Sequence, residues 1–388
     1  MLKSNLLYLI QTLLIAGTIF LVVHRNARAL QLQVLIWCCG VIGVMLRYGT
    51  EGQLGFYSND QLLYVAVLRS LTDWRFTEPE MTSLSWWIEY SKIPYPLAAL
   101  PLSIAGVHAA LALKTVSLIS LLALSHEILK RFKPVSLMRQ LTTLFFSGCA
   151  LIGSFFSVLA LRETMMMYLV FRFTTDKSFV ARLVSLSLLA LLRSHLAAAL
   201  IVAELVMIVW KRLRFRVRLG VAEVPAICLV GFSLGTTMFY WTYRGSQGYA
   251  LLDRIQLPFA TGDGLNQVSK VAANFVGLQF LMTHEAFIRL SIQELFILRV
   301  IFSDTVMIPL IFSLFCLVLG PQLRERHQFA LLAFTIYVSI AINTSFNSFR
   351  QNIPLMPLMG MTVLDFLKSR SQFITTPSRH LHRELPPS

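Results

Sequence analysis

The sequence carries little charge. Asp, Glu, Lys and Arg make up only 14% of its 388 residues, whereas hydrophobic residues make up 56%. A soluble domain needs more polar side chains than this to cover its surface, so we expect much of the surface to face lipid. Apolar segments recur from 5 to 367 without a long polar block between them, and this pattern excludes a separate soluble domain. We predict one integral membrane domain over 1–388.

Cysteine is scarce as well, and its positions exclude two common roles. The chain has five cysteines, and all of them fall inside apolar segments, at Cys38, Cys39, Cys149, Cys228 and Cys316. Neither zinc-ligand spacing nor a pair of loop cysteines is present, so we predict small buried hydrophobic groups and expect no metal site. The sequence also lacks an internal repeat, a Walker-type phosphate loop and a dinucleotide-binding fingerprint.

Acidic residues are outnumbered by basic ones. The chain has 19 Asp and Glu against 34 Lys and Arg, for a formal net charge of +15. A nucleic-acid-binding protein would gather such charge on one soluble face, whereas here the basic residues form short clusters between apolar segments. Such clusters indicate cytoplasmic loops, so we expect a lipid bilayer and no nucleic acid as partner. They comprise Arg25 and Arg28; Lys130, Arg131, Lys133 and Arg139; Lys211, Arg212, Arg214, Arg216 and Arg218; Arg324 and Arg326; and Lys368 and Arg370.

The apolar segments predict an all-α, polytopic membrane protein. A helix needs about 20 apolar residues to cross a bilayer, and runs near that length lie at 5–23, 31–46, 107–129, 140–160, 221–243, 298–320, 328–343 and 353–367. Between 161 and 210, charges divide the pattern into three shorter passes or broken helices. All basic clusters lie on one side only if this region crosses three times and 93–106 does not cross, which gives about 11 spans with the N-terminus outside. The first span ends in His24 and Arg25 instead of a small-residue cleavage site, so we expect it to be retained.

Two long segments then lie on the extracytoplasmic side, at 47–106 and 244–297, while a tail at 368–388 lies in the cytoplasm. The outer segments hold most of the acidic residues and mix Trp, Tyr and Phe with charge, which is typical of interfacial helices. Three prolines between 94 and 101 favour a broken or interfacial segment, because each ring removes a helix donor. We therefore expect the functional site at the extracytoplasmic face.

Charged residues at span ends are the first candidates for this site. Arg162 and Glu163 end one span, and Arg193 and His195 interrupt the apolar run that follows. A central arginine costs about 2.5–3.5 kcal/mol to insert, so these charges are either paired or used. Arg162 either forms an ion pair with Glu163 or binds a lipid phosphate while Glu163 orients it. Arg193 either snorkels or presents a second guanidinium to a diphosphate, and His195 is either a packing residue or a support for Arg193.

Arg350 and Asp60 complete the candidate set. Arg350 precedes the last span, where an arginine either marks the interface or binds phosphate. Asp60, in "YSNDQLLY", is either the N-cap of an amphipathic helix or a general base that removes a proton from a sugar hydroxyl. No cofactor is expected, although a divalent cation held by Asp60 stays open. Lys114 and Glu204 fall within apolar spans and either line a cavity or form buried pairs, and for Glu204, near a cytoplasmic span end, snorkelling is a third alternative.

The layout resembles that of the C-type membrane glycosyltransferases, polytopic enzymes that take sugars from polyprenyl phosphate or diphosphate donors. The likeness rests on "YSNDQLLY" in the first outer loop, the proline segment "IPYPLAALPLSIAG", the "LRE" at a span end and "FRQNIPLMPLMG" near the C-terminus. The layout is also similar to that of the polysaccharide polymerases and ligases of bacterial envelopes. The resemblance implies Asp60 as the base and Arg350 as a phosphate-binding residue, in an enzyme of the bacterial inner membrane. Two spans precede the acidic loop and Gln61 follows Asp60, whereas many of these enzymes have one span there and two adjacent acids.

The predicted function is transfer of a sugar from a polyprenyl-linked donor to a glycan or lipid acceptor in cell-envelope polysaccharide synthesis. In this hypothesis Arg162, Arg193 and Arg350 bind the donor phosphates. Asp60 deprotonates the acceptor hydroxyl, and a one-step attack inverts the anomeric configuration. Two alternatives stay open: an envelope polysaccharide polymerase or ligase, and a flippase or transporter that binds the same donor without breaking it. Transporters often carry internal repeats, which this sequence lacks.

Overall fold

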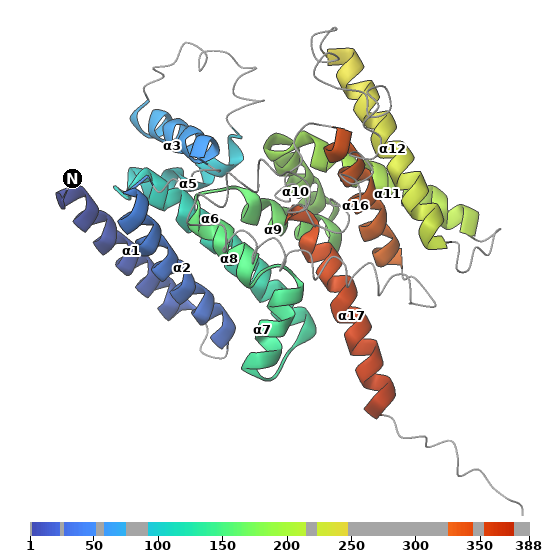
Figure 1. The fold of residues 1–388 in the computed structure, drawn as a ribbon, viewed down its shortest axis with the longest axis horizontal. Coiled ribbons are helices and arrows are strands. Elements are labelled where there is room, and N and C mark those ends of the chain that lie inside the picture. The colour runs from blue at the N-terminus through green and yellow to red at the C-terminus, as the bar shows by residue number, and fades with distance from the viewer. Residues whose placement is uncertain are drawn as a thin grey trace, which may run out of the picture.

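The computed structural model describes residues 2–23, 27–51, 58–74, 92–214, 223–246, 325–343 and 353–375. Every regular element in these ranges is a helix (Figure 1), so the prediction of an all-α protein is confirmed for them. In chain order they are α1 (Leu2–Val22), α2 (Arg28–Tyr48), α3 (Ser58–Asp73), α5 (Pro94–Ile104), α6 (Ala109–Phe132), α7 (Leu137–Phe146), α8 (Leu151–Val158), α9 (Glu163–Thr175), α10 (Phe179–Leu192), α11 (Ser194–Arg214), α12 (Glu223–Ser246), α16 (Glu325–Asn343), η5 (Ile353–Leu355) and α17 (Met356–Thr375).

Several helices have the length and composition of membrane spans. In the described ranges α1, α2, α6 and α11 are long and apolar enough to cross, and the bent pair α7 and α8 adds a fifth candidate. Large apolar side chains such as Leu14, Leu21 and Val180 are exposed on the outside of the bundle. Lipid covers apolar faces of this extent more favourably than water does, so this is a helical membrane protein. The predicted span at 298–320 lies outside the described residues, and the total of about 11 spans stays a prediction.

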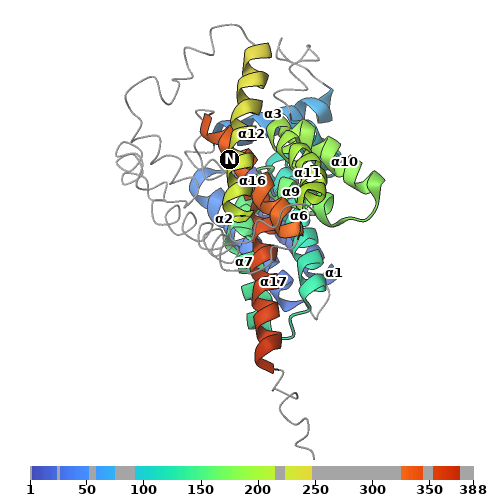
Figure 2. The same cartoon turned by 90° about the vertical axis from the view of Figure 1, so that its right-hand side faces the viewer.

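Helix α6 lies at the centre of the bundle. It is buried along most of its length, whereas α1 is mostly exposed, and it contacts α2, α3, α5, α8 and α9. Figure 1 shows α1 and α2 at one end of the long axis and α12, which packs along α16, at the other. Figure 2 shows α17 running through the bundle, with its C-terminal part beyond the other helices. This helix extends into the predicted tail, of which 376–388 lies outside the described residues.

The predicted span at 140–160 is a broken pair of helices, α7 and α8, which meet at an angle of 72°. Gly148 between them has a φ of 75°, a conformation that only glycine adopts without strain. Its N–H donates to the carbonyl of Phe145 at 3.0 Å. The next N–H, of Cys149, donates to the carbonyl of Leu144 at 2.8 Å. These two bonds form a Schellman motif, which ends α7 inside the apolar run.

Helices α9, α10 and α11 occupy the region 161–210, for which the sequence predicted three shorter passes or broken helices. Arg193 separates α10 from α11 with an extended backbone (φ −158°, ψ 92°). Arg182 Nη2 and Glu204 Oε2 lie 2.8 Å apart, and these residues stand 11 positions on either side of Arg193. The helices α10 and α11 therefore run antiparallel. With 13 and 14 residues, α9 and α10 are shorter than the about 20 residues of a complete straight span.

The segment 47–106, predicted to lie outside the membrane, contains α3 and α5, which pack against each other and against α6. Pro94 and Pro96 lie in the first turn of α5, where a missing N–H removes no helical hydrogen bond. Pro101 lies inside the same helix. The 11 residues of α5 extend only about 16 Å at 1.5 Å per residue, too short to cross a bilayer. The second outer segment, 244–297, lies outside the described residues apart from the end of α12.

Two glycines allow close helix contacts in the C-terminal half. A Cβ atom on Gly360 of α17 would lie 2.2 Å from the carbonyl oxygen of Phe146, and one on Gly235 of α12 would lie 2.4 Å from that of Ile336 in α16. Both distances are shorter than any real contact with a backbone atom. Small residues at such crossings let membrane helices approach closely, because no side chain separates the backbones.

Candidate functional site

The turns before α9 and before α11 place the two predicted arginines at the same end of the bundle. Arg162 directly precedes α9, after Ala160 has turned the chain with a φ of 50°. Arg193 accepts the first helical bond of α11, from the N–H of Leu196 at 3.1 Å. Glu163, the residue after Arg162, lies 3.9 Å from Arg193 between their charged side-chain atoms, so the two turns lie side by side. The fold therefore brings the turns that contain Arg162 and Arg193 to one end of the bundle, and the location of this end at the extracytoplasmic face stays a prediction.

Glu163 is fully buried at this site. Its side chain is 0% exposed, and its Oε1 lies 3.9 Å from Nη2 of Arg193, whose side chain is 11% exposed. Arg193 Nη1 also donates a hydrogen bond to the hydroxyl of Tyr337 in α16 at 3.1 Å. A carboxylate with this little solvent is stable only when cations and donors surround it. Arg193 therefore joins α9, α11 and α16 around one buried negative charge.

Arg162 contacts the first outer segment. Its guanidinium carbon lies 6.0 Å from the ring centroid of Tyr64 in α3, within the range of a cation–π interaction. The ring of Tyr64 meets that of Tyr95 in α5 edge to face, with 5.3 Å between centroids. Arg162 is 9% exposed as a residue, so both arginines are largely shielded from solvent. Through this contact the position of α3 depends on the turn before α9.

Tyr95 connects α5 to α6 beside the turn that contains Arg162. Its hydroxyl oxygen lies within hydrogen-bonding distance of the Leu113 carbonyl oxygen, at 3.0 Å, and of Ser117 Oγ, at 2.7 Å. Ser117 in turn donates to the carbonyl of Leu161 at 2.9 Å, immediately before Arg162. Burial raises the pKa of Tyr95 well above its ordinary value, so the hydroxyl stays a neutral donor. We name this set the arginine–glutamate cluster; it comprises Tyr64, Tyr95, Ser117, Arg162, Glu163, Arg193 and Tyr337.

The structure describes His195 fully, Asp60 only in its backbone, and Arg350 not at all. His195 is partly buried in the first turn of α11. Asp60 lies in the first turn of α3, four residues before Tyr64, but its side chain lies outside the described part. Arg350 lies outside the described residues altogether, three residues before η5. The roles predicted for Asp60 and Arg350 therefore stay predictions.

The structure also contains features that the sequence interpretation missed. The sequence left open whether Glu163 pairs with its neighbour Arg162 or orients it, and it did not predict the ion pair of Glu163 with Arg193. The tyrosines of the cluster were not predicted either. The sequence could have indicated Tyr64, because this residue follows Asp60 by one helical turn.

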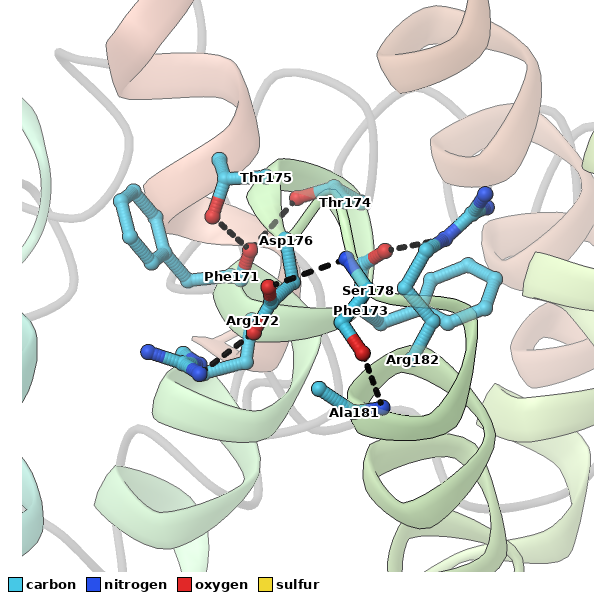
Figure 3. A network of polar contacts seen from close by, with 9 residues as sticks. All are labelled: Phe171, Arg172, Phe173, Thr174, Thr175, Asp176, Ser178, Ala181 and Arg182. Atoms are coloured by element: carbon cyan, nitrogen blue, oxygen red, sulfur yellow. Dashed lines mark hydrogen bonds and ion pairs between the residues drawn. The ribbon is translucent and has the colours of Figure 1, made fainter.

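A second polar network lies at the opposite end of α10 and α11, around the turn between α9 and α10 (Figure 3). The hydroxyls of Thr174 and Thr175 both donate to the carbonyl of Phe171 at 2.9 and 2.7 Å. Arg182 Nε donates to the carbonyl of Phe173 at 3.0 Å, and its guanidinium lies 5.0 Å from the centre of that ring. These bonds satisfy the last carbonyls of α9 and fix the turn into α10.

Two acidic residues in this network are paired with arginines. Asp176 forms an ion pair with Arg172 one turn earlier in α9, and Glu204 pairs with Arg182 as described above. The side chains of Arg182 and Glu204 are 31% and 40% exposed. Glu204 therefore pairs with an arginine of a neighbouring helix, but the pair is partly exposed and is not the buried pair that the sequence left open.

Lys114 is a fully buried cation of α6. Its Nζ lies 5.9 Å from the ring centroid of Tyr8 in α1, so the face of an aromatic ring partly replaces water around the ammonium. At the start of α6, His108 meets Tyr8 edge to face with 5.2 Å between centroids. Burial lowers the pKa of His108 below its ordinary value, although the nearby Glu51 carboxylate opposes the shift.

No group of three or more His, Cys, Asp or Glu side chains that could hold a metal ion occurs among the described residues. Cys38, Cys39, Cys149 and Cys228 are free thiols, while Cys316 lies outside the described ranges. A comparison of the chain with known protein families, curated proteins and solved structures finds no match. Any functional assignment must therefore come from the chemistry of the site.

Proposed function

We propose that this protein is a membrane glycosyltransferase that moves a sugar from a polyprenyl phosphate or diphosphate donor to a glycan or lipid acceptor. The observation that supports it best is the convergence of Arg162 and Arg193 near the buried Glu163 at one end of a membrane bundle. Two buried arginines are expensive in a protein that only needs to span a membrane. Their planar guanidiniums suit phosphate oxygens, which accept two parallel hydrogen bonds from each fork.

In the proposed reaction the arginines bind the donor phosphate and stabilise it as the leaving group. The acceptor hydroxyl oxygen attacks the anomeric carbon and forms the new glycosidic bond, while the bond from that carbon to the phosphate oxygen breaks. The electron pair leaves with the phosphate, where Arg162 and Arg193, with Arg350 as a third arginine, stabilise the negative charge. Asp60 takes the hydroxyl proton. Attack from the face opposite the phosphate inverts the configuration.

The contact between Arg162 and Tyr64 supports a common location for the acid and the arginines. Tyr64 lies over the Arg162 guanidinium, and Asp60 stands four residues earlier in the same helix. Residues four apart are neighbours on one helix surface. The same spacing keeps the alternative role of Asp60 open, because a residue in the first turn of α3 also suits an N-cap.

Replacing Asp60 tests the proposal directly. In purified full-length protein supplied with a synthetic polyprenyl-linked sugar, Asp60→Asn should reduce product formation by about 10²–10⁴-fold, the usual contribution of a general base, while donor binding is kept. Asp73→Asn, at the exposed end of the same helix, is the matched control and should keep full activity. Unchanged transfer by Asp60→Asn would remove this residue from the mechanism.

The reaction products distinguish the proposed single-sugar transferase from the two alternative functions, a polymerase or ligase and a flippase. A single-sugar transferase releases one product of fixed length, whereas a polymerase or ligase moves a growing glycan and gives a ladder or a large product. A flippase moves the intact donor between leaflets and forms no new glycosidic bond. Donor binding that is weakened by Arg193→Gln, without any product in the wild type, would favour the flippase.

A further inference from the structure

A cavity of about 620 Å³ lies between α1, α2, α6 and α7. Helix α2 contacts each of the other three helices. The cavity lies where α1 ends, at Val22, where α2 begins, at Arg28, and where α6 ends, at Phe132. All three helices are candidate membrane spans. Because spans end where the hydrocarbon core meets the lipid headgroups, the cavity lies at the headgroup level of one leaflet.

The cavity belongs to the end of the bundle opposite the arginine–glutamate cluster. Arg131 in the last turn of α6 and Thr174 at the end of α9 line one common hollow, whereas Arg162 precedes the start of α9. The sequence predicts this end on the cytoplasmic side, from its basic residues. We call it the basic end, because exposed cations gather there, among them Lys130, Arg131, Lys133, Arg139 and Lys177.

One face of α6 gives the cavity both an apolar and a basic part. The residues of α6 and its C-cap that line the cavity share one helix face, because their spacing follows the helical turn; they are Leu122, His126, Leu129, Lys130 and Lys133. Leu122 lies about 16 Å before Lys133 along the axis, at 1.5 Å per residue. The face therefore changes from apolar to basic towards the headgroup level, as a phospholipid changes from acyl chain to phosphate.

The walls opposite α6 are apolar. The end of α1 contributes Val22 and Val23, and the start of α2 contributes Ala27 and Leu30. Val22 is 79% exposed, whereas Leu30 is 4% exposed. The wall thus runs from a side chain on the lipid-facing surface to a buried apolar floor. A lipid from the surrounding bilayer can reach this floor from the side of α1.

The charge of the lining is positive. No carboxylate lines the cavity within the described ranges, and Glu127, the one acidic residue of α6, is not part of the lining. Among the ion pairs of the described residues, none includes Lys130 or Lys133. Lys133 also ends α6 in the left-handed conformation (φ 49°, ψ 51°), where glycine is common, so its cation is present at a conformational cost.

We propose that this cavity binds an acidic phospholipid, with Lys130 and Lys133 on the phosphate and an acyl chain along Leu122 and Leu30. Basic pockets between helices at the cytoplasmic side suit such lipids, because the anionic leaflet supplies the ligand. The apolar floor holds the start of the tail, which a soluble phosphate lacks. The proposal is independent of the glycosyltransferase function, since it concerns the other end of the bundle.

Lipid titration followed by native mass spectrometry tests this site. Full-length protein in mild detergent is titrated with phosphatidylglycerol and, in a parallel series, with phosphatidylcholine, and the fraction of folded protein that retains a lipid is measured. We expect the wild type to retain phosphatidylglycerol at lower concentrations than phosphatidylcholine. The double variant Lys130→Gln with Lys133→Gln should weaken the apparent affinity for phosphatidylglycerol about 25-fold, because each cation near an anionic leaflet contributes about fivefold.

The matched control neutralises two cations of the basic end that do not line the cavity, by Arg131→Gln with Lys177→Gln. This variant loses the same net charge as the cavity variant, and it should retain phosphatidylglycerol like the wild type. All four substituted residues are exposed, so melting temperatures in phosphatidylcholine should agree and confirm folding.

Three outcomes would overturn the proposal. One is equal retention of both lipids by the wild type, and another is an equal loss of affinity in the control and cavity variants. The third is displacement of phosphatidylglycerol by millimolar inorganic phosphate, which would assign the cavity to a soluble phosphate instead of a lipid.

Discussion

The two ends of the bundle handle charge in opposite ways. At the arginine–glutamate cluster, Glu163 and Arg193 have side-chain exposures of 0% and 11%. At the basic end, the comparable pair Arg182 and Glu204 is 31% and 40% exposed, and further cations lie around it. Both pairs join an arginine at a helix end to a glutamate of a neighbouring helix, so the two pairs differ in their exposure to solvent.

This difference predicts different energetic roles. A buried charge that loses its partner keeps its full desolvation penalty, whereas an exposed charge regains water. The buried end should therefore be sensitive to single neutral substitutions and insensitive to salt. The exposed end should tolerate such substitutions, and its electrostatic interactions should weaken as ionic strength rises.

The largest effect is expected for Glu163→Gln. The substitution keeps the size of the side chain but leaves Arg193 without its buried counter-charge, which should lower the free energy of unfolding by about 3–5 kcal/mol. Denaturant-induced unfolding of the purified protein in mild detergent measures the loss. Glu204→Gln is the control from the exposed end and should lose about 1 kcal/mol or less. Equal losses in the two variants would contradict the comparison.

A smaller effect is expected for Tyr95→Phe. The variant removes the hydroxyl that donates to Leu113 and contacts Ser117, and leaves a buried carbonyl without that donor. The expected loss is about 1–3 kcal/mol in the same unfolding experiment. Tyr48→Phe makes the same chemical change at an exposed position and should leave stability unchanged. A neutral result for Tyr95→Phe would show that the hydroxyl is not needed to hold α5 on α6.

His108 should make stability depend on pH. Its surroundings include Glu51, Arg69, Lys114 and Tyr8, and burial, the largest influence, lowers its pKa below the ordinary 6.5. As the pH falls, the imidazole of His108 is therefore protonated in the unfolded chain before it is protonated in the folded protein. The stabilisation that His108 contributes to the folded state is complete above about pH 6.5, and it is lost as the pH falls through the lowered pKa of the folded state. Melting temperatures across pH 5–8 for the wild type and His108→Gln should converge towards acid. A His108→Gln profile parallel to the wild type would rule this out.

The smallest effect is expected for the pair of Arg182 and Glu204. A double-mutant cycle with Arg182→Gln and Glu204→Gln should give a coupling free energy of about 0.2–1 kcal/mol, because both side chains remain partly solvated. Raising the salt concentration should reduce the coupling further. A coupling free energy above about 3 kcal/mol, or one that salt does not change, would mean that the Arg182–Glu204 pair is as shielded from solvent as the Arg193–Glu163 pair.

Much of the helical layout followed from the sequence. Apolar run length gave the positions of α1, α2, α6, α12, α16 and α17, because a helix in lipid must satisfy its backbone internally and needs a fixed number of residues. Charge interruptions likewise predicted that 161–210 is divided into three segments, which are α9, α10 and α11. The break at Gly148 was not predicted, since a left-handed turn depends on local backbone geometry that hydropathy does not describe.

The candidate site was less predictable than the helices. The sequence identified Arg162, Glu163 and Arg193 as charges that a simple span would not keep, because the cost of burying charge depends on residue type and depth alone. It did not identify the partner of Glu163 or the tyrosines beside Arg162. Those contacts join residues far apart in the chain and arise only when α3, α5, α9, α11 and α16 pack.

Composition and periodicity were therefore sufficient to establish an all-helical membrane protein whose charges cluster at helix ends. They act through local rules, namely segment length, helix donors and charge in lipid. The folded chain was needed to show that Arg193 lies beside Glu163 and that α10 and α11 run antiparallel. These features depend on which helices are neighbours, and helix packing in lipid is set by the fit of side chains across several helices at once.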